Sequence, residues 1–321
     1  MEQDGEAYSV NITSQCRKRT NLTAMQIEHL KRIEISLPFV ADLAHAYLYL
    51  YVQTKEPGKM LVLKHYRPHT FFSEVELTGE GAFVSTLEEP LIAAAFAKGK
   101  FIQGQREWRF GINLEMYVQP IKCGNDVIGV VSLETGHSYA NSSNYHQLMD
   151  TALYLLDYAK KPLDKDEFHP MSPGTGIIIA DSNNRIVFAN LSANRIYRAL
   201  GIASLVGCRM QDRELSAMLH KETIDSSRPY EREIQIRDFV LVQRDIKLEE
   251  AGMLKRRIML LSDVSELRKK EREIKIKSAV IQEIHHRVKN NLQTIASLLR
   301  LQARRPKAPE VKSDLQESTD R

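Results

Sequence analysis

Residues 264–302 read VSELRKKEREIKIKSAVIQEIHHRVKNNLQTIASLLRLQ and contain neither proline nor glycine. A run of this length without a helix breaker predicts one continuous helix. If Leu267 occupies heptad position a, all a positions are branched aliphatic residues, whereas the d positions are mixed. The a positions are Leu267, Ile274, Ile281, Val288 and Ile295, and the d positions are Lys270, Lys277, Ile284, Asn291 and Leu298. We expect this helix to form a homodimer through a seam of a and d residues that lysine interrupts in its N-terminal half.

The same helix concentrates positive charge. Residues 265–305 hold eleven Lys and Arg against four Asp and Glu, whereas the net charge of the whole chain is +4. A basic stripe can bind nucleic acid, or it can be the solvated face of a helix that meets an acidic protein. The histidine motif inside the stripe favours a protein partner, so we predict no direct contact with nucleic acid.

Residues 1–160 predict an α+β domain built on an antiparallel sheet. Thr23 and Gln26 form a capping-box pattern, which opens a helical segment that reaches Ala44 and is kinked or broken at Pro38. The remaining elements follow in the order strand, strand, helix, strand, strand, helix. They are expected at residues 46–52, 59–66, 90–98, 114–121, 126–134 and 144–160.

Residues 161–175 predict a linker, because three prolines and many charges lie in this short stretch. Residues 176–263 then predict a second domain with the order β-β-α-α-β-β-β, which closes one antiparallel sheet with its helices on one face. Its second helix is expected at residues 212–221. The fold class is therefore α+β: two antiparallel-sheet domains followed by a long dimerising helix.

Composition restricts the cellular setting. No window approaches eighteen consecutive apolar residues and the N-terminus is polar, so we expect a cytoplasmic protein without membrane contact. The cysteines, Cys16, Cys123 and Cys208, form no CxxC pair, and we predict no metal site. We also predict no flavin at Cys208, because the residues that flank the cysteine of a flavin-adduct box are absent. We predict no haem at His220, because a lone histidine in such a place is more often a surface or half-buried residue.

Residues 283–293, EIHHRVKNNLQ, contain two adjacent histidines. In the heptad frame His285 falls at e, beside the seam, and His286 falls at f, facing solvent. A neutral imidazole, with a usual pKa of about 6.5, supplies a nucleophilic nitrogen. Position f makes His286 the more reachable of the two rings.

Residues 283–305 resemble the phosphoacceptor box of sensor histidine kinases of the HisKA type 2 subfamily. The resemblance implies that one histidine takes phosphate from ATP and passes it to an aspartate of a response regulator. Because a histidine that attacks a γ-phosphate must be reachable in line, we predict His286 as the phosphate acceptor and keep His285 as the alternative. It also implies that Asn290, one helical turn after His286, positions the phosphoryl group or a hydrolytic water. Arg287 stands where the more familiar acceptor box has an acidic residue. This departure leaves the general base open, and Glu283 is the substitute that we consider.

Residues 176–263 resemble a PAS domain through Gly176–Asn190, Ala193-Asn194, Leu205–Gly207 and the closing Asp263-Val264-Ser265. In PAS domains the closing motif passes the signal to the outgoing helix, so Asp263 is implied as a signal relay. A simpler reading is compatible with it: Asp263 can accept hydrogen bonds from the first N–H groups of the helix.

Residues 1–160 resemble the GAF-like N-terminal domain of PdtaS-like soluble sensor kinases, through Arg67-Pro68, Glu89–Leu91, Val118–Ile121 and Val127–Val130. This resemblance implies a small-molecule or ionic signal of unknown identity. It further implies a response regulator with an RNA-binding antitermination (ANTAR) output.

The ATP-binding domain of this family, which holds ATP with Mg, is not recognisable in these residues, because no Asp-x-Gly-x-Gly segment occurs. We divide the C-terminal part into a signalling and phosphoacceptor helix, residues 264–305, and the start of a second helix, residues 306–321. We thus expect a piece of a longer histidine kinase, inactive by itself and without a bound cofactor. The alternative is a non-enzymatic dimeric GAF–PAS module that senses a ligand and regulates a partner by contact.

Overall fold

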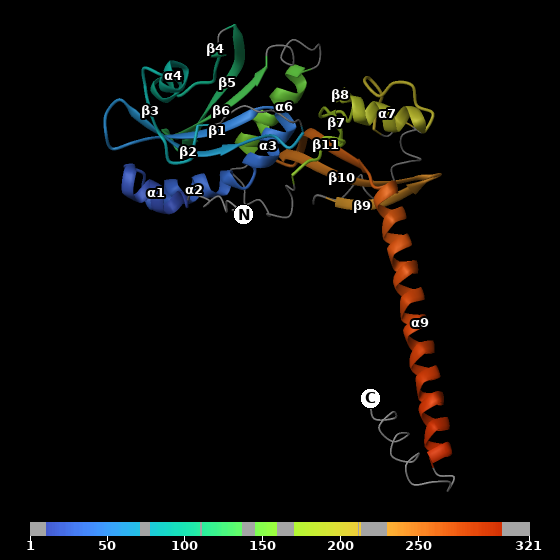
Figure 1. Ribbon diagram of the computed structural model, residues 1–321. Coiled ribbons are helices and arrows are strands. Elements are labelled where there is room, and N and C mark those ends of the chain that lie inside the picture. Colours follow the sequence, from blue (N-terminus) through green and yellow to red (C-terminus); the bar gives the residue numbers. More distant parts are fainter. Residues whose placement is uncertain are drawn as a thin grey trace. The chain divides into compact units, whose positions relative to one another are not determined.

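The computed structural model describes residues 11–70, 78–109, 111–136, 145–158, 170–210, 212 and 230–303 (Figure 1). They form two antiparallel sheets and a long C-terminal helix, which confirms the predicted α+β class. The chain divides into two compact units: Met1–Arg237 with Leu241–Asp263, and Asp238–Val240 with Val264–Arg321. Within the described ranges, no helix combines the length and the apolar character needed to cross a membrane.

The first sheet has the strand order β3-β2-β1-β6-β5-β4. Its strands are β1 (Tyr47–Gln53), β2 (Lys59–Tyr66), β3 (Phe83–Ser85), β4 (Ile102–Arg109), β5 (Ile112–Cys123) and β6 (Asp126–Gly136). The helices of this part are α1 (Ile12–Arg19), α2 (Ala24–Glu34), α3 (Leu37–Ala44), α4 (Pro90–Lys98) and α6 (Tyr145–Tyr158). Because side chains alternate along a strand, residues of the central strand β1 lie on both faces of the sheet. Leu48 and Leu50 pack toward α2, α3 and α6. Tyr49 and Tyr51 pack with α4 on the other face.

Local signals explain where several elements begin and end. The predicted capping box is present, since Thr23 accepts from the N–H of Gln26 and the Gln26 side chain accepts from the N–H of Thr23. Pro38 breaks the predicted helix by lying in the first turn of a separate helix, α3. Pro90 opens α4, and Gly99 ends it in the left-handed region at φ 59°. Helix α1 and strands β3 and β4 were not predicted.

The second sheet has the order β8-β7-β11-β10-β9. Its strands are β7 (Gly176–Ala180), β8 (Ile186–Ala189), β9 (Tyr230–Ile236), β10 (Phe239–Glu250) and β11 (Met253–Asp263), and α7 (Leu191–Ala199) follows β8. All five predicted strands are therefore present. Asn190 fastens α7 to β7, because its side chain accepts from the N–H groups of Ala193 and Ile177, both at 2.9 Å. The helix predicted at 212–221 lies outside the described residues beyond Asp212, as do His220 and residues 304–321.

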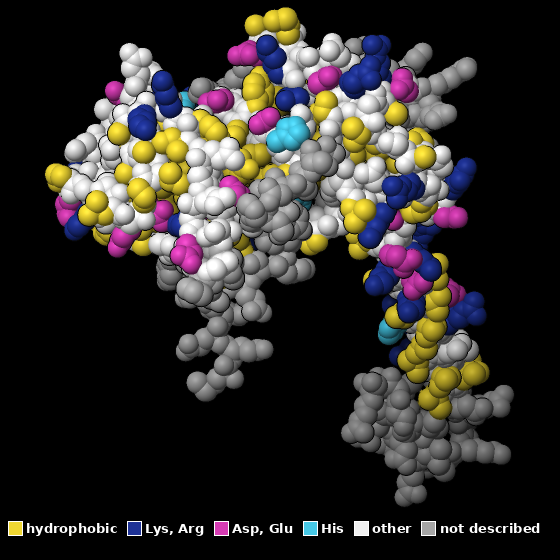
Figure 2. All heavy atoms as spheres, turned by 90° about the horizontal axis from the view of Figure 1, so that it is seen from above, with side chains coloured by type: hydrophobic (Ala, Val, Ile, Leu, Met, Phe, Trp, Pro, Cys, Tyr) yellow, Lys and Arg dark blue, Asp and Glu magenta, His cyan; other side chains and the backbone are white. Residues whose placement is uncertain are grey.

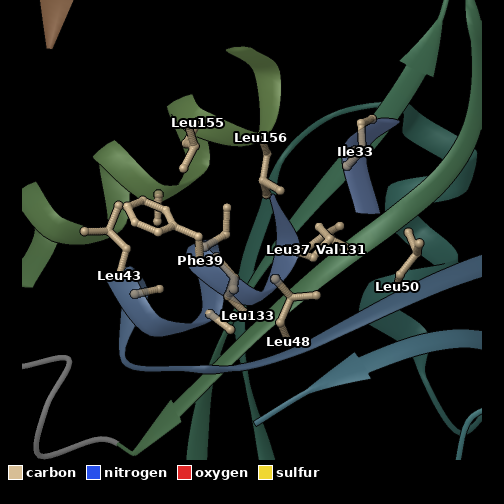
Figure 3. Close-up of a cluster of buried hydrophobic side chains, with 14 of the residues drawn as sticks. Ile33, Leu37, Phe39, Leu43, Leu48, Leu50, Val131, Leu133, Leu155 and Leu156 are labelled. Carbon is tan, nitrogen blue, oxygen red and sulfur yellow. The ribbon is translucent and has the colours of Figure 1, made fainter. Parts of the chain in front are cut away.

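One buried hydrophobic cluster, called here the shared core, joins helices α1, α2, α3 and α6 to one face of each sheet. Figure 3 shows its part between α3, α6 and the first sheet, where Phe39 and Leu43 lie near Leu155 and Leu156. The second sheet contributes Ile177, Ile179, Ile246, Leu248, Ile258 and Leu260. The two sheets are thus parts of one packed unit.

Asp42 of α3 is a buried carboxylate at the edge of this core. It accepts hydrogen bonds from the backbone N–H groups of His69 and, at 2.8 Å, Met171. Burial raises the pKa of Asp42, and these hydrogen bonds and the His69 ring oppose the rise. Asp42 therefore ties α3 both to the chain leaving β2 and to the segment that enters the second sheet.

Replacing Asp42 by Ala should lower the free energy of unfolding by about 2–4 kcal/mol, because two N–H groups lose their acceptor in a buried place. Urea unfolding of this chain measures the loss. Asp42→Asn keeps one acceptor oxygen and should lose less. Equal midpoints for the wild type and both variants would show that the bonds at Asp42 do not stabilise the unit.

Candidate functional site

Helix α9 (Ser265–Ala303) is a single helix of 39 residues, as predicted. The side chains at the predicted a positions are uncovered in this chain, with exposed fractions between 48% and 63%. Figure 2 shows hydrophobic side chains running along the helix with basic ones beside them. Exposed apolar residues in a regular row, rather than scattered singly, indicate a face that another helix covers.

Both histidines of the motif are exposed on this helix, so exposure in one chain does not separate them. The residues that lie one and two heptads after each histidine do distinguish them. The e row of His285 continues with Leu292 and Leu299 and is apolar toward the C-terminus, whereas the f row of His286 continues with Gln293 and Arg300. A helix that covers the apolar rows therefore leaves His286 in solvent and places His285 at its edge.

Glu283 and Asn290 lie on the same outer side as His286, one turn before and one turn after it. The carboxylate of Glu283 is 2.7 Å from Nε of Arg287, and both side chains are mostly exposed. Ion pairs at this exposure are weak, so a docked partner can displace this one. Asn290 is exposed, and its carbonyl accepts the hydroxyl of Thr294 at 2.9 Å.

At the start of α9, two backbone groups of Val240 in β10 hold the first helix residues. The N–H of Val264 donates to the carbonyl of Val240, and the N–H of Val240 donates to Oγ of Ser265, both at 2.8 Å. Asp263, the predicted relay, is the last residue of β11 and lies opposite Leu241. Sequence reasoning placed Ser265 inside the closing motif but missed its bond, because nothing in the sequence indicates that Val240 lies beside it.

A second polar arrangement lies in the first sheet, on the face that carries α4. The guanidinium of Arg106 donates to the carboxylates of Glu89 and Glu134, and Ser132 donates to Glu134 at 3.2 Å. Burial raises the pKa of Glu134 to about 7, although Arg106 lowers it. Two carboxylates thus share one guanidinium, and one of them exchanges a proton near neutral pH.

Sequence reasoning missed this arrangement, since Glu134 ends the strand-like run DVIGVVSLE and nothing in the sequence indicates that Arg106 lies beside it. Tyr49 and Tyr51 face the same charges from β1, and burial raises the pKa of Tyr49 to about 12. Among the described residues, no three His, Cys, Asp or Glu side chains gather as a set of metal ligands.

Two family models match this chain. Residues 12–152 match the model of the GAF domain of the histidine kinase PdtaS, and residues 283–321 match the HisKA_2 model of histidine kinases. The second match contains Glu283, His286 and Asn290. These matches confirm the predicted resemblance to PdtaS-like sensor histidine kinases.

Curated relatives extend the similarity over nearly the whole chain. The sensor histidine kinase PdtaS of Mycolicibacterium smegmatis (strain ATCC 700084 / mc(2)155) is 26% identical over 332 residues, which cover 95% of this chain and 66% of the relative. The same figures hold for PdtaS of Mycobacterium tuberculosis (strain ATCC 25618 / H37Rv). The chain therefore spans slightly less than two thirds of the length of these relatives.

Among solved structures, the sensor region of a sensor histidine kinase superposes with a TM-score of 0.55. The match has 18% sequence identity and covers 80% of this chain and 99% of the other. At this identity the similarity shows the fold alone.

Replacing Glu134 by Gln should flatten the pH dependence of stability between about pH 5 and about pH 8. The folded-state pKa of about 7 lies above the usual value of 4.5, so the folded chain binds this proton more tightly than the unfolded chain. The stability gained is full below the unfolded-state pKa and is lost as the pH rises through about 7. Urea unfolding of both proteins across this range measures the difference.

Half-buried His45, whose pKa desolvation lowers to about 4, gives the opposite slope below its usual value of 6.5. His45 makes the same contribution to the pH dependence of stability in the wild type and in Glu134→Gln. This contribution therefore cancels when the two proteins are compared. The exposed Glu273→Gln is the matched control and should keep the wild-type slope. Parallel curves for wild type and Glu134→Gln would contradict the elevated pKa.

Proposed function

We propose that this chain is the sensor region and phosphoacceptor helix of a cytoplasmic sensor histidine kinase, which autophosphorylates on His286 with ATP and phosphorylates a response regulator. The observation that carries the proposal is an exposed His286 on an uncovered helix, inside the segment that matches the histidine kinase model. In this reading residues 1–160 are a GAF-like domain, 161–175 a linker, 176–263 a PAS domain and 264–305 the signalling helix.

The chemistry follows from the position of the imidazole. A neutral ring nitrogen of His286 attacks the γ-phosphorus of ATP, a nitrogen–phosphorus bond forms, and the bond to the bridging oxygen of ADP breaks. The phosphoryl group then passes from the phosphoramidate to an aspartate carboxylate of the response regulator. ATP and Mg are held by the ATP-binding domain that the resemblance implies, while His286 presents its ring outward so that the attack is in line.

The neighbours of His286 have supporting roles. Arg287 and Lys289 place positive charge beside the histidine, which favours the approach of a triphosphate and of an acidic receiver site. Asn290 orients the phosphoryl group or the water that hydrolyses it. Glu283 accepts the imidazole proton when its ion pair with Arg287 opens.

Two copies of α9 pair along the a and d positions and cover the apolar seam. The sensor unit acts on this pair through the start of the helix, where Val240 holds Val264 and Ser265, with Asp263 as the adjoining relay residue. The input is a small molecule, and the response regulator carries an RNA-binding ANTAR output.

His286→Gln should abolish phosphorylation in the kinase expressed from its complete gene. Incubated with γ-labelled ATP, the variant should retain at least about 100-fold less acid-labile label than the wild type, because the attacking nitrogen is gone. His285→Gln is the matched control and should keep most of the label. If only His285→Gln loses the label, His285 is the phosphate acceptor. If both variants keep the label, the result favours a sensor module that regulates a partner by contact.

Ile281→Glu should weaken dimerisation of this chain at least about 10-fold, because it places a charge at an a position of the paired helices. Sedimentation velocity over a concentration series measures the dissociation constant. Ile276→Glu is the control: Ile276 is 65% exposed, comparable with 54% for Ile281, but lies at heptad position c. Equal dissociation constants for the two variants would contradict the heptad frame.

A further inference from the structure

The first sheet holds one guanidinium between two carboxylates on the face that carries α4. Arg106 of β4 donates from Nη1 to Glu89 and from Nη2 to Glu134. Glu89 directly precedes α4, and Glu134 lies in β6, which β5 separates from β4 in the sheet. The side chain of Arg106 therefore crosses β5 and ties the start of α4 to an inner strand. We call these three residues the acid–guanidinium cluster.

The acid–guanidinium cluster carries one more negative than positive charge when both acids are ionised. The side chains of Glu134 and Glu89 are 1% and 12% exposed, so water screens neither charge well. Burial raises the pKa of both acids, and the charge of Arg106 opposes the rise. Glu134 is the more buried acid, and its pKa reaches about 7. One proton on Glu134 makes the cluster neutral.

The other groups that face Glu134 do not supply a compensating positive charge. Tyr49 and Tyr51 lie on the same face, and burial raises the pKa of both phenols. The residues directly opposite Glu134 in β1 and β5 are Tyr47 and Met116, and Ser132 of β6 donates to it at 3.2 Å. On the α4 side, Glu88 adds negative charge beside Glu89, and Lys98 lies at the far end of the helix.

The hydrogen bonds of Arg106 allow a second arrangement. Each acid receives one Nη nitrogen, whereas a guanidinium beside a single carboxylate can donate two parallel hydrogen bonds. The buried Nε of Arg106 has no acceptor among the residues that the structure describes. Protonation of Glu134 removes the charge that attracts Arg106 to β6, while the charge of Glu89 remains. Arg106 is then held most strongly by Glu89 alone.

We propose that the acid–guanidinium cluster is a proton-operated switch, in which a proton from solvent binds the carboxylate of Glu134 and Arg106 leaves Glu134 to pair with Glu89 alone. Protonation thus releases the tie between β6 and the start of α4, and loss of the proton restores it. The next residue of β6, Thr135, donates to the carbonyl of His45 at the end of α3, at 3.3 Å. The switch therefore lies one residue from a contact with α3, and it does not rest on the kinase assignment.

The test uses the fluorescence of Trp108, the one tryptophan of the chain, which lies in β4 two residues after Arg106. Indole emission responds to nearby charge, so a movement of Arg106 should change it. Titration of this chain should give a sigmoidal change in emission with its midpoint at about pH 7. Glu134→Gln should abolish the transition and emit at every pH as the wild type does at low pH. Glu56→Gln, whose site is 66% exposed between β1 and β2, is the matched control and should keep the transition.

Two further variants separate the switch from simple protonation of Glu134, and they remain informative even if Glu134→Gln does not fold. Arg106→Met should abolish the emission change, because the charge that moves is gone. Glu89→Gln should shift the midpoint to lower pH by at least about 0.5 unit, since Glu89 raises the pKa of Glu134.

Four results would each overturn the proposal. The wild type shows no transition around pH 7, Glu134→Gln keeps the transition, Arg106→Met keeps it, or Glu89→Gln leaves its midpoint unchanged. Phosphorylation of His286 in the complete kinase is measured separately, so either proposal can fail alone.

Discussion

The packing of α3 and α6 in the shared core is the constraint on which the first compact unit depends. This unit comprises Met1–Arg237 and Leu241–Asp263 and is called here the sensor unit. Leu48 and Leu133 from the first sheet and Ile179 and Ile258 from the second lie in one buried cluster with these helices. Close-packed interiors have few voids and respond to a displaced side chain by shifting its neighbours. A change on either sheet must therefore be accommodated by residues that also support the other sheet. Asp42 strengthens this coupling, because its carboxylate holds backbone groups from both parts of the unit.

The faces turned away from the shared core differ in character from the faces turned toward it. On the first sheet, that outer side buries Glu134, whose partner Arg106 is partly buried, beside tyrosines of β1. On the second sheet, it buries Gln243 together with the pair of Arg257 and Asp245. Buried polar groups reduce stability unless every donor and acceptor is satisfied, so hydrophobic residues would be the more stable choice at such positions. On both sheets these polar groups lie on the face opposite the shared core, so the shared core itself stays largely apolar.

The sequence predicted features that depend on neighbours along the chain. The capping box at Thr23, the break at Pro38, the Pro90 and Gly99 ends of α4 and the long α9 all arise from interactions within a few residues. Features that depend on distant residues were missed. Strand β4 is an edge strand of alternating half-buried and exposed residues, and the acids Asp42 and Glu134 become recognisable only when burial brings their partners to them. The division into two domains, residues 1–160 and 176–263, stays a prediction, and residues from both sheets contribute to one hydrophobic cluster. His286 was ranked above His285 by heptad position, and that ranking stays a prediction.

Helix α9 cannot bury its own apolar residues, whereas the sensor unit buries its apolar residues in the shared core. A helix whose a positions are about half exposed cannot bury that row against itself, because side chains on one face of a straight helix all point the same way. Covering the seam needs a second helix, and lysines at Lys270 and Lys277 weaken the cover near the junction with Val240. If two copies of α9 pair as proposed, the pairing is strongest in the C-terminal half, which contains His286, and weakest in the N-terminal half. In the proposed dimer, the lysine-interrupted half of the seam is therefore the part where a change at the start of α9 meets the least resistance from helix pairing.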